Sequence, residues 1–549
     1  MQALYQLSYS PASGPPGATP RRLRQPYTPR AALCQIPFPP LAAPRTPPRG
    51  GPVLSSRDAL PPRPPRAPSH PGAVPVSTLQ QAAGDSKRSL AVKAYALRRP
   101  VTLALAPFLV SFAAFWAAQR TADVSMIDLM VYRAEGWTVR NGYDLYAMRA
   151  TYAHLPTTYP PFAALLFIPL TLLDVAGMRS FATFLNLGLL VVLIHLSLRL
   201  LGRPLHAPRP AATLLIASVA VWCEPVWTTL RYGQINLLLA ALVLWDLSRR
   251  TGHRWAGVGI GIAAGIKLTP ALFAVFLALC GAVQGWRLLR RTGRAADFWN
   301  PRLRQAAVAT VTFLGTALFS ALVLPRDSWR FWGEAVFESG RVGRTEITDN
   351  QALSGVAARL LHTGDPGWLW VGLALLTAVL GLGSAVAAAL AGRRGLPHAH
   401  AWAVLACAVT ALLISPISWS HHWVWCVPVV LLLGAEAQRR SSRGWLAGAL
   451  AATLAFGSYA LWCVPRDPAS DRPPELHQNG GEMLLSAVYP LAGVAFLVLT
   501  AVVALRALRK PTPHNRHEPH GPYGSHEPNE SHEKIEPRTP VVGAEPAAG

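Results

Sequence analysis

Twelve apolar runs divide the middle of this chain, and short arginine-rich segments separate many of them. The hydrocarbon core of a bilayer is about 30 Å thick, and about 20 apolar residues in a helix span it. Several of the runs are shorter than this. We predict an all-α polytopic membrane protein with about 12 transmembrane helices. The runs lie near residues 100–118, 180–200, 211–229, 234–248, 255–266, 269–285, 305–325, 367–391, 400–417, 423–437, 444–463 and 484–506.

The composition excludes a large soluble enzyme. Charged residues make up 14% and hydrophobic residues 51% of the 549 residues, whereas about 25% are charged in an average globular protein. A net charge of +24 would elsewhere suggest nucleic acid as a partner. Here the arginines lie in the tails and between apolar runs, so membrane lipid, and no nucleic acid, is the expected partner. Five of the six cysteines fall in or beside these runs without CxxC spacing. We therefore expect no disulfide framework, no metal and no cofactor.

The chain divides into three parts. Residues 1–88 are dominated by Pro, Arg, Ala and Ser and are predicted to form a disordered cytoplasmic tail. Residues 89–507 contain the membrane-embedded domain. Residues 508–549 are polar and rich in His, and they are predicted to form a second disordered tail.

Arginine clusters set the expected orientation, because positive loops stay in the cytoplasm. The clusters alternate correctly only if the apolar segment 160–175, PFAALLFIPLTLLDVA, lies at the outer interface and does not cross. Both termini are then cytoplasmic, and the loops 119–179, 326–366 and 464–483 face outward from the plasma membrane. The clusters are Arg199/Arg203/Arg209, Arg249/Arg250/Arg254, Arg287/Arg290/Arg291/Arg294, Arg393/Arg394 and Arg439/Arg440/Arg443.

Asp128 lies in the first outer loop, within SMIDLMVYRAEGWTVRNGYDLY. A short amphipathic helix on the membrane would place Asp128 near its start. Its expected apolar face consists of Ile127, Met130, Val131, Ala134 and Val139. A functional carboxylate and a simple helix cap are both compatible with this position.

Lys267, in GIKLTP, falls between two short apolar runs that must form a hairpin. An ionisable residue at membrane depth costs about 2.5 to 3.5 kcal/mol on insertion scales, so it usually has a task or a partner. Lys267 is placed to meet a phosphate, or to form an ion pair with an outer-loop carboxylate. His421 and His422, in SPISWSHHW, join two helices outside. Imidazoles there can bond a phosphate oxygen or a sugar hydroxyl, although two interfacial histidines without a ligand are the alternative.

Weaker candidates for substrate contact are polar side chains at outer helix ends. One of them, Asn350, lies between Asp349 and Gln351 in TDNQALSG. The candidates are Tyr159 in TYPPF, Arg231, Gln234 and Asn236 in RYGQIN, and Asn350.

A carboxylate, a cation and amides that face one wet cavity suit transfer of a sugar from a lipid phosphate. The sequence has neither a Walker loop nor a strand followed by GxGxxG, so a nucleotide-binding domain is not expected. Because phosphate is a good leaving group, the reaction needs one base for the acceptor hydroxyl and one cation for the phosphate.

Six motifs in one order resemble glycosyltransferase family 87, the actinobacterial polyprenyl-phosphate-mannose-dependent α-mannosyltransferases of the C-type membrane glycosyltransferase fold. The resemblance covers about residues 95–507. It implies C-type architecture with an amphipathic first outer loop, Asp128 as the catalytic aspartate, and His421 and His422 in the segment that contacts the donor phosphate. Lys267 matches a lysine found more generally in C-type transferases. The motifs are SMIDLMVYRAEG…NGYDLY, TYPPFAALLFIPL, RYGQINLLLAALVLWDL, GIAAGIKLTPALF, NQALSG and SPISWSHHW.

The sequence therefore predicts an enzyme that transfers a mannosyl, or another hexosyl, residue from a polyprenyl-phosphate donor to an extracytoplasmic glycolipid or glycan. With the β-linked donor that family members use, one displacement with inversion gives an α-linkage. The main alternative is a transporter or flippase of a lipid-linked sugar or other amphiphile, which would have inverted repeats and charges near the midplane. A structural membrane subunit, which would tolerate the loss of Asp128, is a third possibility.

Overall fold

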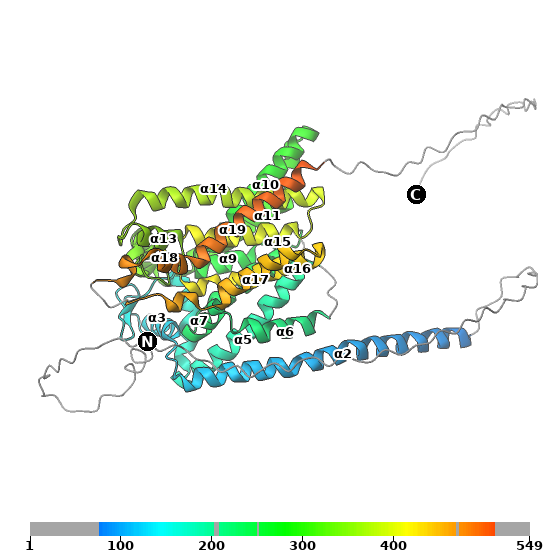
Figure 1. Cartoon of the computed structure of the whole chain (residues 1–549), viewed down its shortest axis with the longest axis horizontal. Helices are drawn as coiled ribbons and strands as arrows, with labels where there is room; N and C mark the ends of the chain where they lie inside the picture. The colour runs from blue at the N-terminus through cyan, green and yellow to red at the C-terminus, as the bar shows by residue number, and fades with distance from the viewer. Residues whose placement is uncertain (1–75, 203–207, 250–251, 468–471, 511–549) are drawn as a thin grey trace, which may run out of the picture.

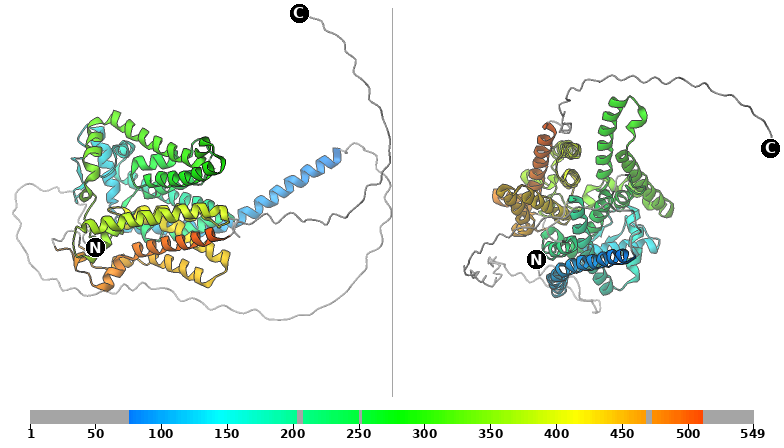
Figure 2. Two further views of the ribbon diagram at one scale, coloured as in Figure 1. Left: turned by 90° about the horizontal axis from the view of Figure 1, so that it is seen from above. Right: turned by 90° about the vertical axis from the view of Figure 1, so that its right-hand side faces the viewer.

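The computed structural model describes residues 76–202, 208–249, 252–467 and 472–510, almost all of which lie in helices and the turns between them. The helices form one body, and α2 extends beyond it at one end (Figures 1 and 2). Six helices are long and apolar enough to cross a bilayer. They are α2 (Val76–Thr121, apolar from Arg99), α5 (Val175–Leu201), α10 (Ala271–Thr292), α11 (Pro301–Val323), α14 (Gly367–Ala391) and α19 (Val488–Arg509).

The shorter helices fill the space between these six and cover one end of the body. The more apolar of them are α4 (Pro161–Phe167), α6 (Arg209–Ala220), α8 (Asn236–Leu247), α9 (Val258–Ile266), α15 (Ala399–Ile414), α16 (Cys426–Arg440) and α17 (Arg443–Gly457). The others are α3 (Ile127–Arg140), α7 (Glu224–Tyr232), α12 (Pro325–Gly333), α13 (Leu353–Leu360) and α18 (Gly480–Ser486).

Short 3₁₀ helices and one strand pair complete the described fold. The strands β1 (Arg149–Ala150) and β2 (Leu155–Pro156) pair antiparallel, with Arg149 opposite Pro156. The 3₁₀ helices are η1 (Ile168–Leu172), η2 (Ala295–Phe298), η3 (Ala335–Phe337), η4 (Ser339–Arg341), η5 (Gly392–Arg394), η6 (Ser420–Trp425), η7 (Ala460–Cys463) and η8 (Pro474–His477).

Every predicted apolar run is largely helical, although run 211–229 is divided between α6 and α7, and the count of twelve spans is not confirmed. Within the described residues six helices qualify by length and composition, or seven if α6 and α7, bent by 79°, form one broken span. Helix α8 has 12 residues and α9 has 9, and at about 1.5 Å per residue neither spans about 30 Å alone. Residues 401–413 of α15 are all buried. Apolar composition there reflects packing inside the protein and not exposure to lipid.

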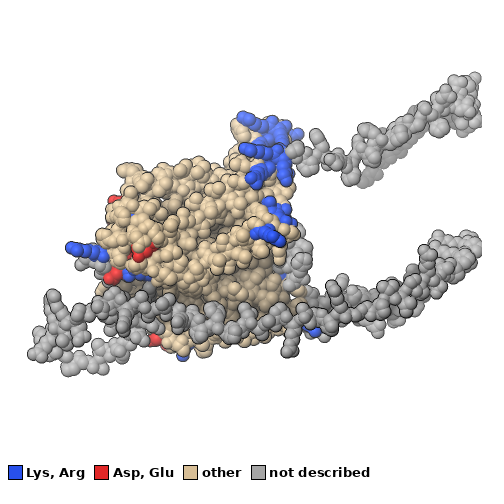
Figure 3. Space-filling model, viewed as in Figure 1, with Lys and Arg blue, Asp and Glu red and all other residues tan. Residues whose placement is uncertain are grey.

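The two ends of the body differ in charge. Helix α2 begins and α19 ends at the same end of the body, whereas α3, α7, α13 and α18 gather at the opposite end (Figure 1). Lysine and arginine side chains cluster where α10 and α19 end, and most of the visible acidic side chains lie toward the opposite end (Figure 3). This polarity agrees with the alternation predicted from the arginine clusters. Arg203 and Arg250 of those clusters lie outside the described residues.

Segment 160–175 does not form a long helix. It folds into α4 and η1, together the 12 residues Pro161–Leu172, which are too short to span a bilayer. Both pack against α3, and Gly136 of α3 makes this approach possible, because a Cβ there would lie 2.5 Å from the Phe167 carbonyl oxygen.

The predicted apolar face of α3 is only partly correct, since Val131 is buried and Met130 and Val139 pack against the core. The helix buries Leu129, Val131, Tyr132 and Glu135, together with Gly136 and Thr138, while Ile127, Met130 and Ala134 line a cavity. Sequence periodicity found an amphipathic helix, but α4, η1 and α7 decide which side is covered.

The domain limits are described only in part. Residues 1–75 and 511–549, which hold most of the two predicted tails, lie outside the described residues. Helix α2 begins at Val76, earlier than the boundary expected at residue 88. The segment VSTLQQAAGDSKR contains good helix formers and no proline, so its composition allows the helix to extend this far.

Candidate functional site

Asp128 lies in the first turn of α3, at the end of the body opposite the arginine clusters. The N-cap of α3 is Met126 in the left-handed region (φ 49°), with no side-chain cap. Asp128 is half-buried, and its Oδ2 accepts a hydrogen bond of 2.8 Å from Gln234 Nε2. Its carboxylate is therefore directed at another helix junction and does not cap α3.

The turn between α7 and α8 brings Gln234 to this carboxylate. Gly233 ends α7 with φ 68°, and a Cβ at Gly233 would lie 2.6 Å from the Cβ of Leu129. Only glycine combines this backbone conformation with such a close approach.

Two tyrosines fix the orientation of the Gln234 amide. Gln234 Oε1 accepts hydrogen bonds from the hydroxyls of Tyr132 (2.8 Å) and Tyr159 (3.3 Å). Because its oxygen is occupied by these donors, the amide NH₂ is directed at Asp128. Tyr159, a predicted substrate contact, is buried and is linked to Asp128 through Gln234.

The surroundings of Asp128 make it a stronger base than an ordinary aspartate. Burial raises the pKa of Asp128 to about 6, although the hydrogen bond from Gln234 and the charge of Lys267 oppose the shift. The carboxylate is thus still largely ionised at pH 7 but holds a proton more tightly than usual. Within the described residues, no hydrogen bond reaches Oδ1.

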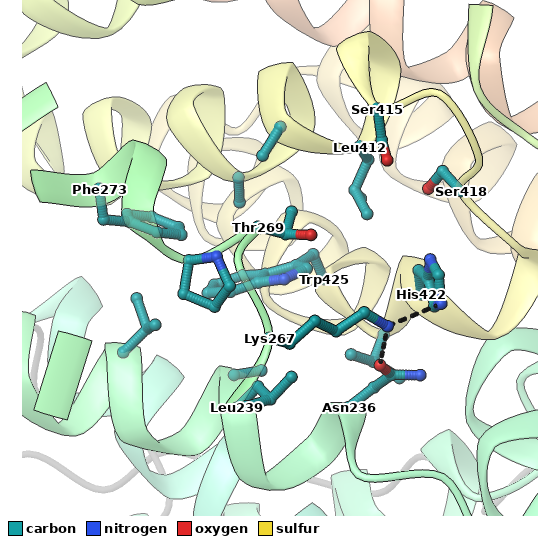
Figure 4. Close-up of a pocket in the computed structure, with 16 residues that line it drawn as sticks. Asn236, Leu239, Lys267, Thr269, Phe273, Leu412, Ser415, Ser418, His422 and Trp425 are labelled. Carbon is teal, nitrogen blue, oxygen red and sulfur yellow. Dashed lines mark hydrogen bonds between the residues drawn. The ribbon is translucent and has the colours of Figure 1, made fainter. Parts of the chain in front are cut away.

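Lys267 immediately follows α9, where the chain becomes extended before α10. Its Nζ lies 2.9 Å from His422 Nε2 and 3.4 Å from Asn236 Oδ1 (Figure 4). The ammonium also lies 5.2 Å from the ring centre of Tyr159. Among the described residues Lys267 forms no ion pair within 4 Å. The ion pair with an outer-loop carboxylate, which was the predicted alternative, is therefore absent from the described residues.

The two adjacent histidines face different surroundings. The His421 and His422 rings are perpendicular, with centres 4.8 Å apart. His422 faces Lys267 and lines a cavity, and burial together with the Lys267 charge holds the pKa of His422 well below its ordinary value. Its neutral Nε2 therefore accepts from the ammonium. His421 packs its ring against Tyr232, and its carbonyl accepts hydrogen bonds from Thr229 and Asn236.

The cavity beside Lys267 is lined by both polar and apolar residues. Its volume is about 50 Å³, which accommodates a few water molecules or one phosphate group. Lys267, Asn236, Ser418 and His422 lie toward one side of the cavity and Phe273 lies toward the other (Figure 4). The rest of the lining mixes polar residues, such as Thr269 and Ser415, with apolar ones, such as Leu239, Leu412 and Trp425.

Asn350 and Arg231 are not among the side chains lining this cavity. Asn350 is fully buried; its Oδ1 accepts from Ser418 N (3.0 Å) and its Nδ2 donates to Thr345 O (2.9 Å). It therefore braces the loop that carries the histidines. Arg231 is partly exposed in the last turn of α7.

Sequence reasoning missed Glu224, although a carboxylate inside an apolar run is itself a signal. Glu224 is fully buried at the start of α7. It accepts hydrogen bonds from Tyr489 (2.6 Å), Thr228 (2.7 Å) and Ser420 (3.0 Å), and so ties α7 to α19 and η6.

Two further residues of α3 were missed. Tyr132 and Glu135 follow Asp128 by four and seven residues, the spacing of one helix face, and this spacing could have found them. Glu135 is buried and its Oε2 has no hydrogen-bond partner among the described residues. Burial raises the pKa of Glu135 to about 8.

The arrangement can remove a proton and hold an anion in neighbouring places. Asp128 is the candidate base, and the hydrogen bond from Lys267 to neutral His422 leaves the ammonium charge available to an anion. In the described part of the chain, no group of three or more His, Cys, Asp or Glu side chains is placed to hold a metal ion.

Comparisons with known proteins agree on one family. Residues 158–416 match glycosyltransferase family 87. The chain is 32% identical over 367 residues to a polyprenol-phosphate-mannose-dependent alpha-(1-2)-phosphatidylinositol pentamannoside mannosyltransferase of Mycobacterium tuberculosis (strain CDC 1551 / Oshkosh), which covers 64% of this chain and 78% of that protein. It is 35% identical over 352 residues to a polyprenol-phosphate-mannose-dependent alpha-(1-2)-phosphatidylinositol mannoside mannosyltransferase of Mycolicibacterium smegmatis, which covers 60% of this chain and 74% of that protein.

Among solved structures, ArnT from Cupriavidus metallidurans bound to undecaprenyl phosphate aligns over 74% of this chain and 77% of its own, with 13% identity and a TM-score of 0.33. The C-type architecture stays a prediction from the sequence. The sequence relatives are sufficient on their own for the family. This polytopic membrane protein belongs to glycosyltransferase family 87.

Proposed function

We propose that this glycosyltransferase transfers a mannosyl residue from a polyprenyl-phosphate donor to a phosphatidylinositol mannoside, forming an α-(1-2) linkage with inversion. The names of the relatives support this donor, acceptor and linkage. Family membership also favours transfer over the transporter or flippase alternative.

The proposed mechanism rests on the contacts of the turn between α7 and α8. The chain from Gln234 to Asn236 bridges a carboxylate and an ammonium, because Gln234 donates to Asp128 and Asn236 accepts from Lys267. The turn between α7 and α8 is therefore bonded to both a proton acceptor and an anion-binding cation, and a cavity lies beside the cation.

In the proposed step, Asp128 takes the proton of the acceptor hydroxyl as its oxygen attacks the anomeric carbon of the donor. The new C–O bond forms while the bond from that carbon to the phosphate oxygen breaks, and polyprenyl phosphate leaves with the electron pair. The charge on the leaving phosphate increases during transfer, and Lys267 stabilises it. A β-linked donor gives an α-linked product.

The cavity beside Lys267 suits the head of such a donor. Its polar side chains, among them Asn236, Lys267 and His422, can hold the phosphate, and the polyprenyl chain then lies outside this small volume. His422 orients the ammonium and can itself bond a phosphate oxygen.

The proposed location is the plasma membrane with the site facing outward, because the site lies at the end opposite the arginine clusters. In a Cys34→Ser/Cys463→Ser background, Ala147→Cys should react with an impermeant thiol reagent on intact cells, and Thr292→Cys only after lysis. Both positions are exposed, and so is native Cys463. Labelling of Thr292→Cys on intact cells, with Ala147→Cys protected, would reverse the orientation.

The test of function is transfer by purified protein. Incubation with radiolabelled polyprenyl-phosphate-mannose and a phosphatidylinositol mannoside should give a larger radioactive glycolipid, which an α-mannosidase degrades. Absence of product from folded protein, when a family relative gives product in the same assay, would contradict the proposal.

A further inference from the structure

A second cavity lies on another side of α3. Its volume is about 590 Å³, within the range of about 300–1,000 Å³ of small-molecule sites. It is bounded by one face of α3 and by the chain around β1, residues 148–152. No residue is shared between its lining and that of the cavity beside Lys267.

The lining is cationic and rich in hydroxyl groups. Arg133 and Arg149 both line it, with Ser125, Thr138 and Thr151, and no carboxylate does. In the described part of the chain, neither Arg133 nor Arg149 forms an ion pair. Two uncompensated guanidinium groups at one cavity favour an anionic ligand.

Arg133 is only partly satisfied by the protein. One terminal nitrogen donates to Leu173 O at 3.3 Å, whereas its buried Nε has no partner among the described residues. A buried donor without an acceptor is costly. Arg149 donates one terminal nitrogen to Met148 O (2.9 Å) and is otherwise exposed. Both side chains thus retain donors for a phosphate, whose oxygens pair well with a guanidinium.

We propose that this cavity binds the phosphodiester headgroup of the anionic glycolipid acceptor, with Arg133 and Arg149 on the phosphate. The inference rests on the proposed function and adds the site that selects the acceptor. The hydroxyls of Ser125, Thr138 and Thr151 are placed to bond inositol and sugar hydroxyls. Trp137 is 49% exposed at this cavity, and its indole ring offers an apolar face to a sugar ring.

The position of Asp128 fits a site between two substrates. Ser125 and Ile127, on either side of Met126, line the acceptor cavity, while Asp128 is bonded to Gln234 on the side of Lys267. The start of α3 thus separates the two cavities. An acceptor held by its phosphate at Arg133 and Arg149 can extend its mannose past this turn to the carboxylate, as the donor approaches from the other side.

The experiment compares acceptors with and without a phosphate. Arg133→Gln/Arg149→Gln protein is assayed with phosphatidylinositol dimannoside and with octyl α-mannoside, with polyprenyl-phosphate-mannose as donor. The KM for the anionic acceptor should rise about tenfold to a hundredfold, since two charge-assisted contacts are lost. The KM for the donor and for octyl α-mannoside should stay within about twofold. Arg140→Gln, an exposed arginine of α3 that does not line the cavity, is the matched control and should behave as the parent.

Two results would overturn the acceptor site. A rise in the KM for the donor alone would place the donor phosphate at these arginines, and an unchanged KM for the anionic acceptor would leave the cavity without this role. Retention of phosphatidylinositol dimannoside in native mass spectrometry gives a readout independent of turnover. Equal retention by parent and double variant would contradict the site, and loss of retention in the variant would support it. This measurement needs no sugar donor.

Discussion

The two ends of the helical body treat buried charge in opposite ways. At the arginine-rich end, the buried Glu436 accepts hydrogen bonds from His398, Arg439 and Arg440. At the opposite end, Asp128 receives one hydrogen bond from a neutral amide, and Lys267 contacts a histidine and an amide. One carboxylate forms ion pairs with two arginines and accepts a further hydrogen bond from a histidine, while the other is left able to bind a proton.

This difference separates stability from reactivity. A buried ion pair whose partners are all present has little left to offer a substrate, and removal of one partner leaves an uncompensated charge. A carboxylate and an ammonium held close but not in contact are each incompletely satisfied, so each can interact with a reacting group.

The largest effect is expected for Asp128→Asn. The amide keeps the shape but accepts no proton, so turnover should fall about 10²- to 10⁴-fold. The measurement is mannosyl transfer at saturating donor and acceptor, with the thermal midpoint as the control for folding. Near-normal turnover by a folded variant would make Asp128 a structural residue like Glu436.

Lys267→Met should lower kcat about 10²- to 10³-fold, because a cation beside the leaving phosphate stabilises the transition state more than the ground state. The KM for the acceptor should change little, and Lys267→Arg need not restore activity, since a planar fork differs from a compact ammonium. Arg231→Met, which removes a cation near the same turn but outside the cavity lining, is the control and should retain most activity. Loss of protein yield with normal turnover in the survivors would instead mark Lys267 as structural.

The pH profile sharpens the assignment of the base. Since burial raises the pKa of Asp128 to about 6, the ionised base is lost as pH falls through this value, and kcat/KM should drop about tenfold per pH unit below it. Removal of the hydrogen bond from Gln234, which favours the ionised form, should move the acid limb of Gln234→Ala to higher pH. An acid limb that stayed in place would mean that another group titrates.

The smallest effect on turnover is expected for Glu436→Gln. The change leaves His398, Arg439 and Arg440 without their carboxylate, so stability should fall by about 1–3 kcal/mol, measured as a lower thermal midpoint in detergent. Turnover per folded molecule should stay within about twofold, because Glu436 is at the far end from the site. A large loss of kcat in folded Glu436→Gln would break the division between the two ends.

Individual residues show how far sequence reasoning reaches. The sequence points to Asp128, Lys267 and His422 as candidates, because ionisable side chains at apolar boundaries are rare enough to be noticed one at a time. The structure brings them to one helix junction through Gln234 and Asn236. The second cavity was not found, since nothing in the sequence relates Arg133 of the α3 helix to Arg149 until β1 folds beside α3. Asn350 was assigned to substrate contact from its position, but its amide holds Ser418 in the adjoining loop.

By itself the sequence determined the helical class, the location of the apolar runs that form helices, the polarity of charge between the two ends and the candidate base and cation. These follow from local composition and from the cost of placing charge in lipid, which act on each segment independently. The tertiary structure decided which face of α3 is buried, which of the two histidines meets Lys267, and how many helices are long enough to cross. These depend on close approaches such as Gly233 against Leu129, because packing between distant segments is not encoded in the periodicity of either one.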